Sequence, residues 1–132
     1  MPSYLIVTAR EPLAAAVAVR SWPDGPPDSF VTSPSPEAQD TAAFVANGTQ
    51  VASVDEPLLA RRGPTEDWTE FRARFAEALR VVSARDARAG LIVCDEVPDR
   101  WITPLLVDGD GILELARSLE SEPARESPGR PA

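Results

Sequence analysis

The chain has 132 residues, a formal net charge of -8 and no histidine, and its basic residues are all arginines. Nucleic acids and anionic membranes are poor partners for so acidic a chain, because basic patches supply most of the affinity for both. Histidine is the usual group for proton transfer near neutral pH and the commonest metal ligand. Any chemistry must therefore use carboxylates, arginines, hydroxyls or the thiol of Cys94, and we expect no metal and no cofactor.

The composition also predicts where the protein resides and how far its folded part extends. One cysteine, no apolar run of about 18 residues and no secretory-type start predict a cytoplasmic protein without a membrane segment. Abundant Ala, Arg and Pro without lysine are typical of a GC-rich, actinobacterial-type genome. The length favours a single domain over residues 1–119. Residues 120–132 are rich in Ser, Glu, Pro, Arg and Gly, which predicts a disordered tail.

The first half of the chain alternates between short apolar runs and helical patterns. The predicted strands centre on Leu5-Ile6-Val7, Ser29–Thr32 and Gln50–Val54. An alanine-rich helix begins at Pro12, and a second helix runs from Pro36 to about Asn47 with Ser35 as its N-cap. We predict that Leu58 to Pro64 is a loop.

The second half begins with the longest predicted helix, about Glu66 to Ala84, with Thr65 as its cap. Its apolar residues recur every three or four positions and predict a buried stripe of Trp68, Phe71, Phe75, Leu79 and Val82. Leu91 to Cys94 reads as a buried strand. We predict helical structure for Trp101 to Val107 despite Pro104, and a final amphipathic helix over Asp110–Leu119.

The alternation of strands and helices predicts an α/β protein: a three-layer α/β/α sandwich around a mostly parallel sheet. In such sheets, ligands bind beyond the carboxyl ends of the strands. The residues that follow the predicted strands are therefore the candidates for a site. They are Thr8, Ala9, Arg10 and Glu11 after the first strand, Ser33 and Glu37 after the second, and Asp95 and Glu96 after the strand that ends at Cys94.

Three of these segments resemble motifs of one family. A strand is followed by Thr8-Ala9-Arg10-Glu11, then comes Thr32-Ser33-Pro34-Ser35-Pro36-Glu37-Ala38-Gln39-Asp40-Thr41-Ala42, and a late strand ends at Asp95-Glu96. The order and spacing resemble the histidine phosphatase superfamily, whose fold is called phosphoglycerate mutase-like. Its small members carry Arg-His-Gly-Glu, Ser-Ser-Pro-Leu-x-Arg-Ala-x-Gln-Thr-Ala and a later Ser/Thr-His-Gly. The resemblance implies a minimal member of that fold over about residues 4–119.

The same resemblance implies that the phosphatase chemistry has been lost. In the family, two arginines bind the phosphoryl group, one histidine attacks it and a second stabilises it. Here Thr8 and Glu37 stand at the arginine positions, and Ala9 and Asp95 stand at the histidine positions. We therefore expect an acidic cleft, with Arg10 as its one evident cation, and no phosphatase or mutase activity.

The sequence leaves several functions open for such a cleft. The first is an inactive pseudoenzyme that serves as a binding or regulatory module for a small molecule or a partner protein. The second is a repurposed enzyme of specialised metabolism, in which Glu37, Asp95 and Glu96 act as acids and bases. The third is a Mg²⁺ or Ca²⁺ site, although no loop spacing of a known site is present. Homo-oligomer formation is compatible with each of these.

Purely structural interpretations apply to the same residues. Asp95 and Glu96 could be solvated loop residues or a helix cap, since acids favour the N-termini of helices. Arg10 could simply pair with Glu37. Glu11 could cap the helix that begins at Pro12, and Cys94 could be a small buried apolar residue rather than a nucleophile.

Overall fold

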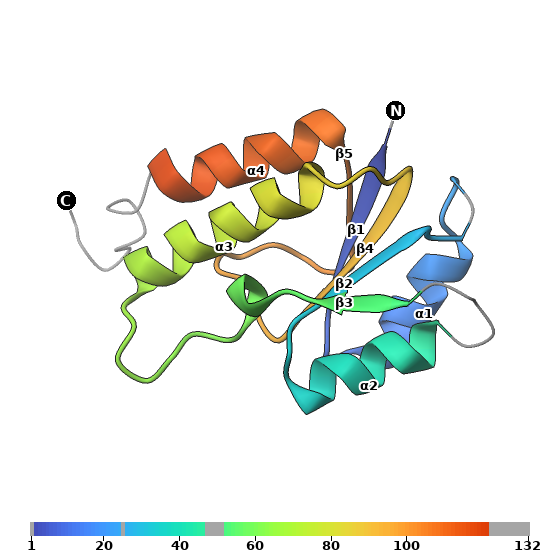
Figure 1. Ribbon diagram of the computed structural model, residues 1–132, viewed down its shortest axis with the longest axis horizontal. Helices are drawn as coiled ribbons and strands as arrows, with labels where there is room; N and C mark the ends of the chain where they lie inside the picture. Colours follow the sequence, from blue (N-terminus) through green and yellow to red (C-terminus); the bar gives the residue numbers. More distant parts are fainter. Residues whose placement is uncertain (1, 25, 47–51, 122–132) are drawn as a thin grey trace.

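The computed structural model describes residues 2–24, 26–46 and 52–121. The elements, in chain order, are β1 (Ser3–Thr8), α1 (Pro12–Arg20), β2 (Ser29–Thr32), α2 (Pro36–Val45), β3 (Ser53–Asp55), the 3-10 turn η1 (Pro57–Leu59), α3 (Trp68–Ser83), β4 (Ala89–Cys94), β5 (Leu105–Asp108) and α4 (Gly109–Ser121). They form an α/β fold in which helices flank both faces of a five-stranded sheet (Figure 1).

The strand order of the sheet is β3-β2-β4-β1-β5. Strand β4 pairs in parallel with both β1 and β2, and β3 extends the parallel part by pairing with β2. Strand β5 pairs antiparallel with β1, with Ser3 opposite Asp108. The sheet is thus mixed and mostly parallel, as the sequence predicts. Strands β1 and β4 lie at its centre and are buried on both faces, which explains their continuous apolar sequences.

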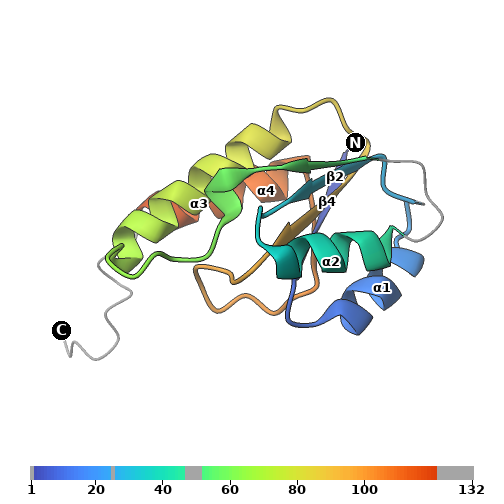
Figure 2. The same ribbon diagram turned by 60° about the horizontal axis from the view of Figure 1, so that its bottom comes forward.

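Alternate residues of the central strands face two separate cores. Tyr4, Ile6 and Ile92 pack with the aromatic and aliphatic side chains of α3 and α4 on one face. Leu5 and Leu91 belong to the core on the other face, beneath α1 and α2. Figures 1 and 2 show α3 and α4 side by side in one layer and α1 and α2 in the other.

Helix α3 confirms most of the predicted stripe but begins later than predicted. Phe71, Phe75, Leu79 and Val82 are buried, whereas Trp68 is 46% exposed. The N-cap is Asp67 rather than Thr65, because Asp67 and Glu70 form a reciprocal capping box. Trp68 therefore lies in the first turn of the helix, where it stacks on Phe71.

The prediction of helical structure for residues 101–107 is wrong. Leu105–Asp108 forms the antiparallel strand β5, in which more and less exposed residues alternate. Pro104 cannot donate the amide hydrogen bond of a helix interior, and the two-residue period of a half-buried strand follows it. The apolar run at residues 101–107, which includes most of β5, was compatible with a helix because short apolar segments do not distinguish the two structures.

The remaining boundaries shift by a few residues. Ser35 caps α2 as predicted, because its hydroxyl accepts a hydrogen bond from the Ala38 amide at 3.1 Å. Strand β3 begins at Ser53, and the predicted loop at 58–64 includes part of η1. Helix α4 continues to Ser121, two residues past the predicted domain end. The rest of the predicted tail, the helix end at 47–48 and the strand start at 50–51 lie outside the described residues.

Three arginines of α3 bind neighbouring parts of the fold. Arg72 is 2% exposed, and its guanidinium donates to the carbonyls of Pro98 and Ser118, both at 3.3 Å, and pairs with Asp99. Arg80 forms a two-pronged ion pair with Glu120, which joins α3 to α4. Arg74 binds the loop before α3.

In the described parts of the chain, every helix is too short or too polar to cross a membrane.

Candidate functional site

Three parallel strands end at the same edge of the sheet and bring the predicted site residues together. Thr8 at the end of β1 is in register with Cys94 at the end of β4, and the Ala9 amide donates to the Cys94 carbonyl at 2.8 Å. The Ser33 amide likewise donates to the Val93 carbonyl at 2.8 Å. These two bonds continue the sheet pairing beyond the strands, so the segments after β1, β2 and β4 converge.

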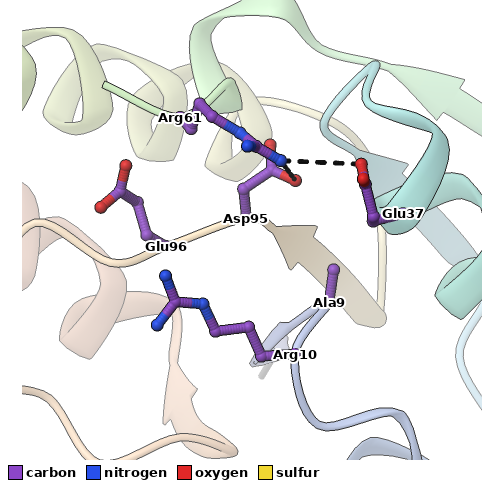
Figure 3. Close-up of a pocket in the computed structure, with 6 residues that line it drawn as sticks. All are labelled: Ala9, Arg10, Glu37, Arg61, Asp95 and Glu96. Carbon is purple, nitrogen blue, oxygen red and sulfur yellow. Dashed lines mark ion pairs between the residues drawn. The ribbon is translucent and has the colours of Figure 1, made fainter. Parts of the chain in front are cut away.

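A cavity of about 200 Å³ lies where these segments meet (Figure 3). It is lined by Ala9, Arg10, Glu37, Arg61, Asp95 and Glu96. Five of these six residues are predicted site residues, and they come from the ends of β1 and β4 and the first turn of α2. Trp22 and Trp101 do not fill the cavity, because Trp22 donates to the Ser3 hydroxyl at the start of β1 and Trp101 packs on Phe75.

Asp95 is the most firmly held of the carboxylates. Its side chain is 6% exposed, and both of its oxygens accept short hydrogen bonds, from the Ser33 hydroxyl at 2.6 Å and the Ser35 hydroxyl at 2.5 Å. The Ser35 oxygen also caps α2, so Asp95 is tied directly to the helix that carries Glu37. The interpretation of Asp95 as a solvated loop residue or a helix cap is therefore wrong.

Arg61 is the site residue that the sequence did not reveal. Its guanidinium lies 3.6 Å from a Glu37 oxygen and 3.7 Å from an Asp95 oxygen, so one cation bridges carboxylates of two segments. The Arg61 side chain is 59% exposed, and that of Glu37 is 65% exposed. Two guanidiniums thus face three carboxylates in the pocket. The expectation that Arg10 is the one evident cation of an acidic cleft is therefore wrong, because Arg61 is a second cation.

Arg74 of α3 fixes the backbone of the loop that carries Arg61. Its guanidinium donates to the carbonyls of Leu58, Ala60 and Arg61 at 2.8, 2.9 and 3.2 Å. It also binds both oxygens of Glu66, at 2.7 and 2.8 Å. The Arg74 hydrogen bonds are the main cause that lowers the pKa of Glu66 to about 2. The backbone of Arg61 is thus held firmly, while its side chain is held by two long ion pairs.

The predicted pairing of Arg10 with Glu37 does not occur. Glu37 pairs with Arg61, and the exposed Arg10 makes no hydrogen bond or ion pair with the residues that the structure describes. Glu96 is half-buried, and one of its oxygens accepts a hydrogen bond from the Arg62 amide at 2.9 Å. Arg10 is therefore the charged side chain of the pocket with the fewest contacts, and Figure 3 shows its guanidinium on the side of the pocket where Glu96 lies.

A second cavity, of about 320 Å³, adjoins the first and shares Arg10, Asp95 and Glu96 with it. Its other lining residues are Thr8, Glu11, Val97 and Thr103. Glu11 occupies the N-cap position of α1, but its side chain forms no capping hydrogen bond there. Ser33 is buried and lines neither cavity, so it contributes through its hydrogen bond to Asp95. Seven of the eight predicted site residues thus line two adjoining cavities.

Cys94 is a buried apolar residue, as the structural interpretation predicts. Its side chain is fully buried, and its thiol donates to the Val7 carbonyl at 3.5 Å. Burial is the main cause that raises the pKa of this thiol far above its ordinary value, and the negative charges of Asp95 and Glu96 raise it further. A thiol that stays protonated and faces the core is not a nucleophile.

The charged groups of the pocket differ in their exposure. Around a small open space lie two exposed guanidiniums, of Arg10 and Arg61, and three carboxylates, of which Glu37 is largely exposed, Glu96 half-buried and Asp95 buried. Among the described residues, no three His, Cys, Asp or Glu side chains are grouped so that they could hold a metal ion. Comparisons with family models, with curated proteins and with solved structures find no match to this chain.

Proposed function

We propose that this chain is a degenerate relative of the histidine phosphatases, with a phosphoglycerate mutase-like fold, that acts as a binding or regulatory module without catalytic activity. One observation carries the proposal. Ala9, Glu37 and Asp95, which stand at positions where the resemblance expects a histidine, an arginine and a histidine, line a single cavity at the strand ends. The resemblance assigns these three residues to one site, and the cavity that they share supports the proposal.

The chemistry of these side chains opposes phosphoryl transfer. Ala9 has no nucleophilic atom, and the carboxylates of Glu37 and Asp95 replace groups that would stabilise negative charge. A transferring phosphoryl group spreads negative charge over its oxygens, and catalysis depends on cations and donors aimed at that charge. In this pocket three carboxylates outnumber the two guanidiniums. The guanidinium of Arg61 already forms ion pairs with Glu37 and Asp95.

The repurposed-enzyme alternative has less support. A general acid or base must exchange a proton with its substrate. Both oxygens of Asp95 already accept hydrogen bonds from serine hydroxyls, Glu37 is close to Arg61, and one oxygen of Glu96 accepts the Arg62 amide. These contacts favour a fixed recognition surface over proton transfer.

A phosphatase assay tests the loss of activity. We expect purified protein to hydrolyse p-nitrophenyl phosphate no faster than buffer, and the Arg10→Ala variant to behave identically. A hydrolysis rate that persists through purification and is lost in Arg10→Ala would overturn the proposal, because Arg10 is the pocket cation free to meet a phosphate.

A charge-reversal experiment tests whether the acids exclude phosphate. Glu37→Arg restores the cation that the resemblance expects at this position, and we expect inorganic phosphate to raise the melting temperature of this variant but not of the wild type. Glu77→Arg makes the same charge change on the exposed side of α3 and is the matched control. Equal stabilisation of all three proteins by phosphate would show that position 37 does not govern anion binding, contrary to the proposal.

A further inference from the structure

An apolar groove lies beside the candidate pocket, between α1 and α2. Leu13 and Val17 of α1 are 72% and 61% exposed, and Phe44 of α2 is 49% exposed. A cavity of about 250 Å³ between the two helices is lined by Pro12, Leu13, Asp40, Thr41 and Phe44. Large apolar side chains that gather around a groove, with an acid at its edge, are typical of a contact surface for another molecule.

One face of α2 connects this groove to the pocket. Glu37, Thr41 and Phe44 are three or four residues apart and therefore follow one another along the same side of the helix. Glu37 lines the pocket, whereas Thr41 and Phe44 line the groove. The Thr41 hydroxyl donates to the carbonyl of Ala9, another pocket residue, at 3.3 Å. The contact between Thr41 and Ala9 thus joins a lining residue of the groove to a lining residue of the pocket, and Figure 2 shows α1 and α2 side by side.

We propose that the pocket and the groove together form a docking surface for an extended peptide segment of a partner protein. The segment presents a basic side chain to the pocket and an apolar side chain to the groove. This inference rests on the binding function proposed above and specifies the partner. Glu37 and Phe44 are about 10 Å apart along the axis of α2, given a rise of about 1.5 Å per residue. A segment in the extended polyproline II conformation rises about 3.1 Å per residue with three residues per turn, so side chains three positions apart span this distance and point to the same side.

The charges of the surface select the basic side chain. Three carboxylates outnumber two guanidiniums in the pocket, and Asp40 adds a further negative charge at the edge of the groove. The Arg61 guanidinium is beyond hydrogen-bonding distance of Glu37 and Asp95 and is largely exposed, so a basic side chain from a partner can take its place. Arg10 is available to donate to a backbone carbonyl of the bound segment.

The same charges argue against a second copy of this chain as the occupant. Each copy carries a net charge of -8 and would bring the same acidic rim to the interface. Like charges placed opposite one another across an interface disfavour association. A basic and apolar segment of another protein complements both the charge of the pocket and the apolar walls of the groove.

Three fluorescently labelled peptides test the proposal. The first contains Arg-Gly-Ser-Leu within a Gly/Ser background, the second has Gln in place of Arg, and the third has Ser in place of Leu. Anisotropy titrations give the affinities, and amide chemical shifts of labelled protein locate the contact. We expect the first peptide to bind about tenfold more tightly than either single replacement, as for loss of one anchor residue.

Protein variants locate the two halves of the surface. We expect Glu37→Gln and the double variant Leu13→Ser/Phe44→Ser each to weaken binding of the Arg-Gly-Ser-Leu peptide about tenfold. Glu77→Gln and Leu113→Ser are matched controls, because Glu77 lies on α3 and the 41% exposed Leu113 on α4, in the opposite layer. Far-ultraviolet circular dichroism and thermal melts verify that each variant is folded.

Three results would overturn the proposal. The first is equal affinity of the three peptides, and the second is equal effects of the control and surface variants. The third is a concentration-dependent dimer that Leu13→Ser/Phe44→Ser dissociates, because such a dimer would assign the groove to a second copy. Because the phosphatase assay is independent of these titrations, failure of the peptide test in an inactive protein refutes the docking surface alone. Hydrolysis of phosphomonoesters would refute the function on which the docking surface rests.

Discussion

The two helical layers use their apolar side chains in different ways. In the α3/α4 layer, Phe71, Phe75 and Leu79 are fully buried against the sheet. In the α1/α2 layer, the buried helix positions are small ones such as Ala15 and Ala38, and large apolar residues such as Leu13 remain exposed. Small residues let α1 and α2 approach the sheet closely and leave larger side chains for the outer surface. The α3/α4 layer therefore buries the larger side chains against the sheet, whereas the α1/α2 layer buries small ones.

The arginines differ between the same regions. Arg72, Arg74 and Arg80 of α3 bind carbonyls or carboxylates of other elements. Arg10 and Arg61 in the pocket have no hydrogen-bonded partner or only long ion pairs among the described residues. The guanidiniums of α3 thus join elements of the fold, whereas those of the pocket make few contacts. The predictions that follow test this division.

Truncation of a core aromatic should produce the largest difference between the layers. Phe75→Ala removes a fully buried ring that packs against Phe71 and Trp101, and we expect a loss of about 3 to 5 kcal/mol in the free energy of unfolding. Phe44→Ala is the matched control in the other layer, where the half-exposed ring should cost about 1 kcal/mol or less. Urea unfolding measures the loss in each variant. Similar losses would contradict the difference in burial between the two layers.

Removal of the Arg74 guanidinium should have the next largest effect. Arg74→Met keeps the stem but loses the bonds to three loop carbonyls and to Glu66, and we expect a loss of about 2 to 3 kcal/mol. Hydrogen exchange of the amides of residues 60–66 should accelerate, because the loop loses its anchor. Arg80→Met removes a more exposed pair with Glu120 and should cost about 1 kcal/mol or less. Unchanged exchange in Arg74→Met would show that the loop is fixed by other contacts.

The two helix caps should differ because one of them also supports the site. Ser35→Ala loses the cap of α2 and the hydrogen bond to Asp95, so we expect a cost of about 2 kcal/mol. Asp67→Ala loses the cap of α3 and should cost about 1 kcal/mol, while Thr65→Ala should be close to neutral. Thermal and urea unfolding provide the comparison. A larger cost for Thr65→Ala than for Asp67→Ala would refute the observed start of α3.

The last prediction concerns acid stability and depends on Glu66. The pKa of Glu66 is lowered to about 2 in the folded protein, mainly by its hydrogen bonds to Arg74, from an ordinary value of 4.5. A carboxyl with a depressed folded-state pKa contributes stability above its unfolded pKa and loses it as the pH falls. The contribution should therefore be complete above pH 4.5 and decline as the pH falls to about 2. Glu66→Gln should flatten this decline in urea unfolding, and an unaltered pH dependence would contradict the assignment.

Much of the fold was predictable because its signals are local. The apolar run Leu5-Ile6-Val7 and its counterpart at residues 91–94 have the continuous hydrophobicity of strands buried on both faces. Ser35 before Pro36 indicates a helix start by itself. The pocket residues after these strands were predictable for the same reason, because parallel strands end at one edge of the sheet.

The features missed by the sequence depend on distant contacts. Arg61 lies in an irregular loop with no periodicity, and it reaches the pocket because Arg74, on a later helix, binds the carbonyls around it. The cap of α3 was misplaced because Glu66 is held by Arg74 before the helix begins. Strand β5 was mistaken for a helix, although Pro104 disfavours a helix interior. Its pairing with β1 joins segments from opposite ends of the chain and leaves no local signal in the sequence.

The position of Cys94 gives this molecule an internal reporter. It is the one cysteine of the chain, and its sulfur lies within the central strand, sealed from solvent by the α3/α4 core. An alkylating reagent can reach it only when the sheet opens, so the labelling rate counts these rare openings under fully native conditions. Mass spectrometry of labelled protein can therefore measure the frequency of these openings in the unmodified fold.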